Sequence, residues 1–140
     1  MSGADSYLTL LGRILIAWIF IAGGIAKLSA PAATIAAFGT RVGLPLPVVA
    51  YVIAVIVEVG LGILLLIGFQ TALTGIVLAI WCVATALVAH TGWVNPDMKM
   101  HFMKNIAMAG GLLFVAVHGA GTLSVDAMLG RRKPDKFALR

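Results

Sequence analysis

Long apolar runs, interrupted at wide spacing by single polar side chains, dominate the pattern along this chain. The first run extends from about Tyr7 to Leu28, with Arg13 inside it. The next runs from Val42 to Pro96 and contains Glu58 as its only aspartate, glutamate, lysine or arginine. A bilayer core of about 30 Å requires roughly 20 apolar residues in a helix. The first run therefore predicts one transmembrane helix, and the second is long enough for more than one.

Turn signals divide the rest of the chain. Gly68-Phe69-Gln70-Thr71 predicts a tight turn, which leaves one span at about 47–67 and another at about 72–89. The segment from His90 to Asp97 predicts a loop by its glycine and Asn-Pro signals. A fourth apolar span follows at about 101–118. The pattern predicts an all-α membrane protein, a bundle of four transmembrane helices.

Shorter elements are expected between and after the spans. Ser29 to Thr40 predicts a surface helix, with a proline near its start and a glycine near its end. The segment 43–47 is expected to be extended, because each of its prolines disfavours helix at the preceding residue. Ser124 is suited to cap a short helix that has Asp126 in its first turn. The bundle is therefore expected to carry short interfacial helices.

The composition agrees with a bilayer as the solvent. Hydrophobic residues make up 61% of the 140 residues and charged residues only 11%, with a mean hydropathy of +1.08. A soluble domain carries roughly 25% charged residues. Cys82 is the only cysteine, which excludes an intramolecular disulfide and any CxxC motif. The start lacks a basic segment before the first apolar run, so that run is interpreted as a retained helix.

The distribution of charge predicts orientation. Half of the ten basic residues lie within 131–140, which is expected to be a basic cytoplasmic tail that follows a membrane domain at 1–130. A juxtamembrane tail explains the basic pI better than nucleic-acid binding does. With four spans, both termini share the cytoplasmic side. Trp93, in the loop between the last two spans, is suited to the opposite membrane interface.

Two polar residues inside the spans have alternative explanations. Burying an ionised Glu58 at its depth in the bilayer costs about 2.5–3.5 kcal/mol. Protonating a glutamate at pH 7 costs about 3.7 kcal/mol. These free energies are too similar to decide whether Glu58 is ionised or neutral. Glu58 is expected between helices, either in an inter-helix pair or as a proton carrier or headgroup ligand. Arg13 either extends to the headgroups or pairs with Glu58. His118, at a similar level, is interpreted as an interfacial histidine.

Polar side chains also gather at the opposite ends of the spans: Lys27, His90, His101, Lys104 and Asn105. They are either ordinary interfacial anchors or donors to an anionic or quinone-like headgroup. His90 and His118 lie at opposite ends of their spans and cannot share a haem, and a His90–His101 pair has no third metal ligand. No metal site is expected, and no flavin or dinucleotide motif is present.

Several motifs, in order, resemble those of the DoxX family of small bacterial inner-membrane proteins over roughly residues 7–130. The matching segments are Gly12-Arg13, Phe20 to Leu28, Gly43 to Pro47, Glu58 with Gly60 and Gly62, Leu66 to Gly68, His90, Phe102 to Asn105, Gly110 to Leu113, and Gly119 to Ala127. The basic residue that the family often places after the turn at Gly68 is missing. The resemblance implies a four-helix membrane fold and a function in redox chemistry. The family name is tied to a thiosulfate:quinone oxidoreductase. Relatives are linked to quinone, to oxidative-stress resistance and to soluble redox enzymes as partners.

Three functions follow as hypotheses. The first is a quinone- or lipid-interacting component of a membrane redox system, a subunit beside a partner oxidoreductase, with no cofactor of its own beyond a bound quinone. Its contacts would be Lys27, Glu58, His90, Lys104 and Asn105, with Arg13 and His118 structural or in ion pairs. The second is a non-catalytic membrane anchor for a soluble enzyme. A small transporter is disfavoured because no inverted repeat or broken helix is found. Partner identity and homo-oligomerisation stay open.

Overall fold

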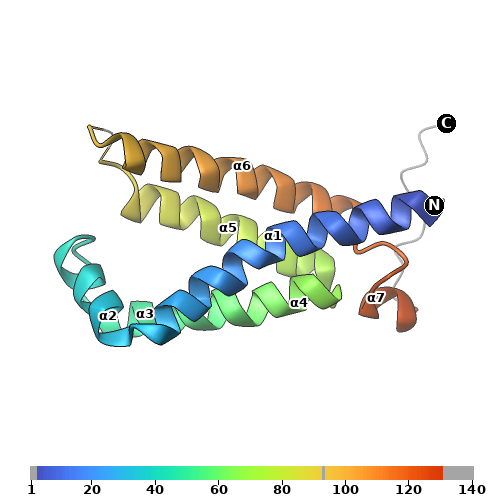
Figure 1. Ribbon diagram of the computed structural model, residues 1–140, viewed down its shortest axis with the longest axis horizontal. Helices are drawn as coiled ribbons and strands as arrows, with labels where there is room; N and C mark the ends of the chain where they lie inside the picture. The colour runs from blue at the N-terminus through green and yellow to red at the C-terminus, as the bar shows by residue number, and fades with distance from the viewer. Residues whose placement is uncertain (1–2, 93, 131–140) are drawn as a thin grey trace.

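A computed structural model describes residues 3–92 and 94–130 (Figure 1). The described residues form helices and connecting turns, without strands: α1 (Gly3–Ser29), α2 (Pro31–Thr40), α3 (Pro47–Val55), the π-helical segment η1 (Ile56–Leu61), α4 (Gly62–Ile67), α5 (Thr71–Ala89), α6 (Pro96–His118) and α7 (Val125–Met128). Four helical stretches are long and apolar enough to cross a membrane: Ala4–Ser29, Pro47–Ile67, Thr71–Ala89 and Pro96–His118. The predicted all-α, four-span architecture is confirmed.

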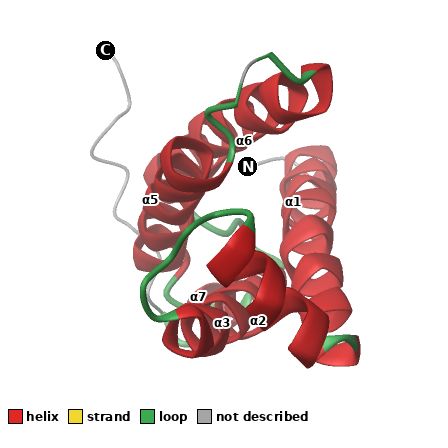
Figure 2. Cartoon of the chain, turned by 90° about the vertical axis from the view of Figure 1, so that its left-hand side faces the viewer, coloured by secondary structure: helices red, strands yellow, loops and turns green. Residues whose placement is uncertain are grey.

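The spans are arranged as a tight hairpin beside a looser pair. Helices α5 and α6 run side by side along their length, while α1 crosses η1 and α4 (Figure 1). Helix α2 covers one end of the bundle in contact with α3 and α1 (Figure 2). The N-terminus and α7 lie at the other end (Figure 1). Below, these are called the α2 end and the terminal end.

The interior is small and the outer surface is apolar. Leu65, Leu78 and Leu112 are fully buried at the centre of the core. Large side chains face outward instead, among them Trp18 and Phe114, each 70% exposed. Exposed apolar area of this extent is unfavourable in water and suits hydrocarbon. Most of the large apolar side chains of this protein therefore face lipid and not the interior of the bundle.

The second span has the predicted bounds but is not a regular α-helix. Between α3 and α4 the backbone forms the π-helical segment Ile56–Leu61, which contains Glu58. The sequence analysis predicted the bounds of this span and did not predict its change of winding. A π turn inserts one extra residue per turn and is frequent at functional sites. The continuously apolar sequence on both sides conceals this change of winding.

The fourth span begins five residues earlier than predicted. The side chain of Asn95 accepts a hydrogen bond from Asp97 N at 2.9 Å, and Pro96 occupies the first helical position. An asparagine cap followed by proline starts a helix, although the same dipeptide also marks turns. The predicted surface helix and the Ser124-capped helix are both present as α2 and α7. The predicted tail at 131–140 and the interfacial Trp93 lie outside the described residues.

Candidate functional site

A cavity of about 970 Å³ opens at the α2 end and is lined by all four spans and α2. Its lining contains all five residues that the sequence analysis assigned to a headgroup site: Lys27, Glu58, His90, Lys104 and Asn105. They come from α1, η1, the residue after α5, and α6. The structure thus brings together side chains that are up to 78 positions apart in sequence, from Lys27 to Asn105.

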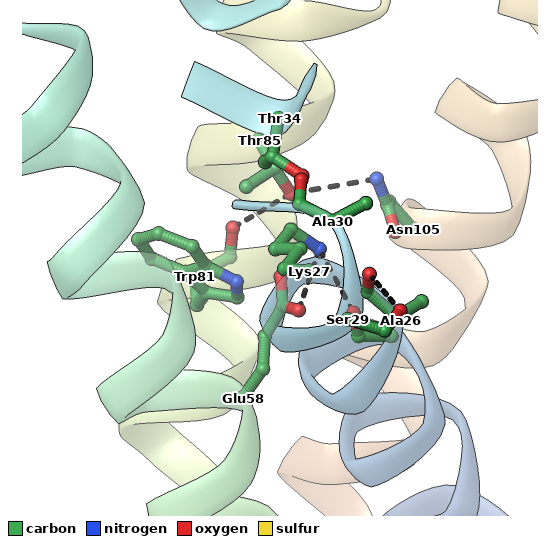
Figure 3. Close-up of polar contacts among 10 residues, drawn as sticks. Ala26, Lys27, Ser29, Ala30, Thr34, Glu58, Trp81, Thr85 and Asn105 are labelled. Carbon is green, nitrogen blue, oxygen red and sulfur yellow. Dashed lines mark hydrogen bonds and ion pairs between the residues drawn. The ribbon is translucent and has the colours of Figure 1, made fainter. Parts of the chain in front are cut away.

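An ion pair between two spans lines part of the cavity. Lys27 Nζ donates to Glu58 Oε2 at 2.6 Å and lies 3.5 Å from Gly23 O (Figure 3). The two side chains are 24% and 12% exposed. Glu58 is therefore located between helices, as predicted. Its partner is Lys27 and not Arg13, so the proposed Arg13–Glu58 pair is wrong.

Glycines on α1 make this pairing possible. A Cβ at Gly23 would lie 3.3 Å from Glu58 Oε2, and one at Gly24 would overlap Val59 Cγ2 and lie 3.2 Å from Val59 N. The last distance involves backbone, which cannot rotate away. Small residues let two helices approach closely in a membrane. The Gly23-Gly24 pair therefore brings α1 and η1 near enough for Lys27 to reach Glu58.

A second polar group lies between α5 and α6. The rings of His90 and His101 stack with centroids 5.2 Å apart, and Lys104 Nζ lies 3.3 Å from His101 Nδ1. Burial lowers the pKa of His90, and the charges of His101 and Lys104 lower it further. A lowered pKa keeps the His90 imidazole neutral near pH 7. Its Nδ1 atom is buried without a hydrogen-bond partner.

Asn105 belongs to a short chain of hydrogen bonds beside the ion pair (Figure 3). Its Nδ2 donates to Thr85 Oγ1 at 3.4 Å, and that hydroxyl donates to the carbonyl of Trp81 at 2.9 Å. Trp81 and Thr85 line the cavity with Arg41 and Cys82, and the sequence analysis missed these four as site residues. The one signal available was the spacing of Trp81 and Thr85, four residues apart on one helix face.

Arg13 has a structural role at the terminal end. Its Nη1 donates to the carbonyls of Leu65 and Leu66 at 3.2 and 3.0 Å, and its Nη2 donates to the carbonyl of Leu123. The residue is 1% exposed. Arg13 therefore neither reaches for headgroups nor pairs with Glu58. It satisfies carbonyls at the end of α4, which lack partners within the helix.

Asp126 completes this structural cluster. Its carboxylate accepts from Gln70 N and Thr71 N, both at 2.8 Å, and its own amide donates to Gly68 O at 2.9 Å. Asp126 thus caps α5, a role that its place in the first turn of α7 did not reveal. His118, as expected for an interfacial residue, is exposed, with Nδ1 2.9 Å from Phe114 O.

The chemistry of the cavity is that of hydrogen bonding and charge. Within the described ranges, no group of three or more His, Cys, Asp or Glu residues is placed to hold a metal ion. The available donors are ammonium, amide and imidazole groups, and one carboxylate is present among the lining residues. Such a set can orient a carbonyl, phosphate or carboxylate group. The fold and cavity define a multi-span helical membrane protein with a polar pocket inside its bundle.

Comparison with known proteins gives the family. Residues 8–91 match the DoxX family, and the chain belongs to it. It is 34% identical over 129 residues to inner membrane protein YphA of Escherichia coli K12, which covers 88% of this chain and 91% of that protein. Inner membrane protein YqjF of the same organism is 32% identical over 126 residues, covering 88% and 92%. The putative oxidoreductase CatD of Bacillus subtilis 168 is 30% identical over 129 residues, 89% of each chain.

No solved structure matches the chain. The family match includes Arg13, Lys27, Glu58 and His90 and ends before α6. The three relatives cover 88–89% of the chain, which is more than residues 8–91 and therefore extends the similarity toward the fourth span. The resemblance inferred from the motifs is confirmed.

Proposed function

We propose that the protein is an inner-membrane component of a redox system that binds the headgroup of a quinone or lipid and works with a partner oxidoreductase. The observation that carries this proposal is the cavity, whose lining joins apolar walls to clustered hydrogen-bond donors. Its volume of about 970 Å³ is near the upper end of small-molecule sites, roughly 300–1,000 Å³. Two relatives are named inner membrane proteins, which supports the location.

The lining residues fit an amphiphile with a carbonyl-bearing head. Lys27, Lys104 and Asn105 can each donate to a carbonyl oxygen, and the unpaired Nδ1 of His90 can donate or accept according to its tautomer. Ile19, Phe20 and Met108 provide apolar wall for a tail. When bound, a quinone would supply the two-electron chemistry. The residues of this chain would bind and orient its head.

The redox part of the proposal has a narrower basis. One relative, 30% identical, is named a putative oxidoreductase. The chain carries no flavin or dinucleotide motif, so electrons would come from a partner. The basic residues at 131–140 and the loops are the proposed contacts for such a partner. Both termini are proposed to face the cytoplasm, on the basis of the tail charges.

Quinone retention during purification tests the proposal. The full chain is extracted in mild detergent, and quinone per protein is measured by chromatography for wild type, Lys104→Ala and His90→Ala. Each variant is expected to retain several-fold less quinone while its melting temperature stays near that of wild type. Lys99→Ala and His118→Ala are matched controls, because neither residue lines the cavity. Both should retain quinone.

The opposite outcome is equally clear. If Lys104→Ala and His90→Ala unfold and no quinone is found with wild type, the residues are structural and the headgroup site is wrong. A non-catalytic membrane anchor for a soluble enzyme would then explain the chain better.

A further inference from the structure

The polar group beside α6 contains basic side chains in mutual contact. His90 stacks on His101, and Lys104 Nζ approaches His101 Nδ1. The carboxylate of Glu58 is paired with Lys27 on the other side of the cavity and not with any of these three side chains. Basic side chains that contact one another in this way favour binding of an anion, which would offset the repulsion among them when they are protonated.

The proton arrangement leaves donors available. A lysine ammonium can only donate, so Lys104 is the donor in its 3.3 Å contact with His101 Nδ1. Lys104 keeps its other N–H groups, and His90 Nδ1 is buried without a partner. Several donors in one small region are what phosphate oxygens require.

The depth of the group suits a lipid headgroup. His90 directly follows α5, which ends at Ala89, and His101 and Lys104 lie in the first turns of α6. Both elements are candidate spans, so these residues lie at the level where hydrocarbon gives way to headgroups. Lys104 and His101 are exposed, and Lys104 also lines the cavity. A headgroup can therefore reach them from the membrane surface.

We propose that His90, His101 and Lys104 form a binding site for a phosphate group, most simply the phosphodiester of an anionic lipid. This inference rests on the proposed function, because His90 and Lys104 are headgroup contacts there too, and it names the chemical class of the head that they bind. The surrounding charge favours an anion: Lys27, Arg41 and Lys104 line the cavity with Glu58 as the one acidic lining residue.

Binding of phosphate should be coupled to protonation of His90. The groups that face it are His101 and Lys104 on α6, with Lys27 and Arg41 also along the cavity and Glu58 held by Lys27. An anion favours the imidazolium form, so it raises the pKa of His90 from its lowered value. The complex then binds more protons than the free protein. Affinity must therefore increase as pH falls toward and below the ordinary histidine pKa of about 6.5.

Binding of short-chain lipids to the full chain in maltoside micelles tests the site. The probes are dihexanoyl phosphatidylglycerol, dihexanoyl phosphatidylcholine and inorganic phosphate, titrated at pH 6 and pH 8 with tryptophan fluorescence as the signal. We expect phosphatidylglycerol to bind about tenfold more tightly than phosphatidylcholine at pH 6, with a smaller ratio at pH 8. Lys104→Gln should weaken phosphatidylglycerol about tenfold, the scale of one charge-assisted hydrogen bond. Lys99→Gln should change it less than twofold.

Equal affinity for the two lipids at both pH values would overturn the proposal. Equal losses of phosphatidylglycerol affinity in Lys104→Gln and Lys99→Gln would overturn it too. Competition by inorganic phosphate would identify a free anion as the occupant, and its absence would identify the lipid; both support the phosphate site. If Lys104→Gln does not fold, the wild type decides through NMR titration of its histidines, with His90 assigned from His90→Gln. Phosphatidylglycerol must raise the pKa of His90, and an unchanged pKa refutes the site. Because His90 and Lys104 belong to both proposals, the two measurements are judged separately: loss of quinone retention with phosphatidylglycerol binding intact refutes only the quinone part of the proposed function.

Discussion

At the scale of single residues, the Lys27–Glu58 pair identifies the partner of the one acidic residue inside the second span. An ionised glutamate inside a span and a protonated one have similar costs. The structure gives the Glu58 carboxylate a lysine partner at 2.6 Å, which is the inter-helix pair that was one of the alternatives. The partner was hidden because Lys27 lies near the end of its helix, where lysines normally extend to the headgroups. The position of Glu58 between helices was predictable from its place in an apolar span.

Removing one member of this pair should cost more than removing both. Lys27→Met leaves the Glu58 carboxylate buried without its cation, which is expected to cost about 3–5 kcal/mol. The double variant Lys27→Met/Glu58→Gln should recover part of that loss, since no charge is left behind. Glu58→Gln alone should preserve folding better than Glu58→Leu if hydrogen bonding at this position matters. Denaturant unfolding in mixed micelles measures all four, and additive losses in the double variant would contradict the pairing.

At the scale of elements, glycine contacts explain why α5 and α6 lie so close. A Cβ at Gly75 on α5 would be 2.9 Å from the carbonyl oxygen of Leu112 and 3.2 Å from Ala116 Cβ on α6. The nearer contact is with backbone, so side-chain rotation cannot relieve it. By contrast, a Cβ at Gly110 on α6 would meet nothing within 4 Å.

These two glycines should respond oppositely to alanine. Gly75→Ala is expected to destabilise the protein by about 1–3 kcal/mol, because α5 and α6 must move apart. Gly110→Ala should be neutral or stabilising by up to about 1 kcal/mol, because alanine favours helix over glycine. Thermal denaturation of both variants in the same detergent checks the contrast. A larger loss at Gly110 would show that the helix contact is misassigned.

The elements themselves were largely predictable, and the exceptions have physical reasons. Run lengths gave the spans at Pro47–Ile67 and Thr71–Ala89 to within one residue. The start of α6 was missed because Asn95-Pro96 serves equally as a turn and as a helix cap. The π-helical segment was missed because residues on both sides are apolar all round, so a change of winding leaves no trace in the pattern.

At the scale of the whole molecule, orientation in the membrane is the main prediction from charge. Cysteines introduced at Thr40 and Arg140 should react with impermeant reagents from opposite sides of the membrane, with Arg140 on the cytoplasmic side. Thr40 ends α2 and is exposed. The native Cys82 is 1% exposed, so background labelling should be low. Labelling of both positions from one side would rule out this topology.

The sequence predicted most of the polar residues of the candidate site but not the cavity that they line. Shared position at one end of the spans indicated that Lys27, His90, Lys104 and Asn105 would converge, and all four line the cavity. The contributions of Arg41, the residue after α2, and of Trp81 were not predictable. Which face of an apolar helix turns inward depends on packing against its neighbours, and a uniformly apolar sequence does not encode that choice.

The cluster around Arg13 and Asp126 has a consequence for the order in which the protein matures during synthesis. The carbonyls that end α4 and the amides that begin α5 find partners in Arg13 and Asp126, and Arg13 is also held by the carbonyl of Leu123. Residues 123 and 126 leave the ribosome after all four spans. The first three spans must therefore enter the bilayer before Asp126 can cap the start of α5 and before Leu123 can hold Arg13. We expect the nascent bundle to stay open to rearrangement until the last residues of the membrane domain arrive and close it.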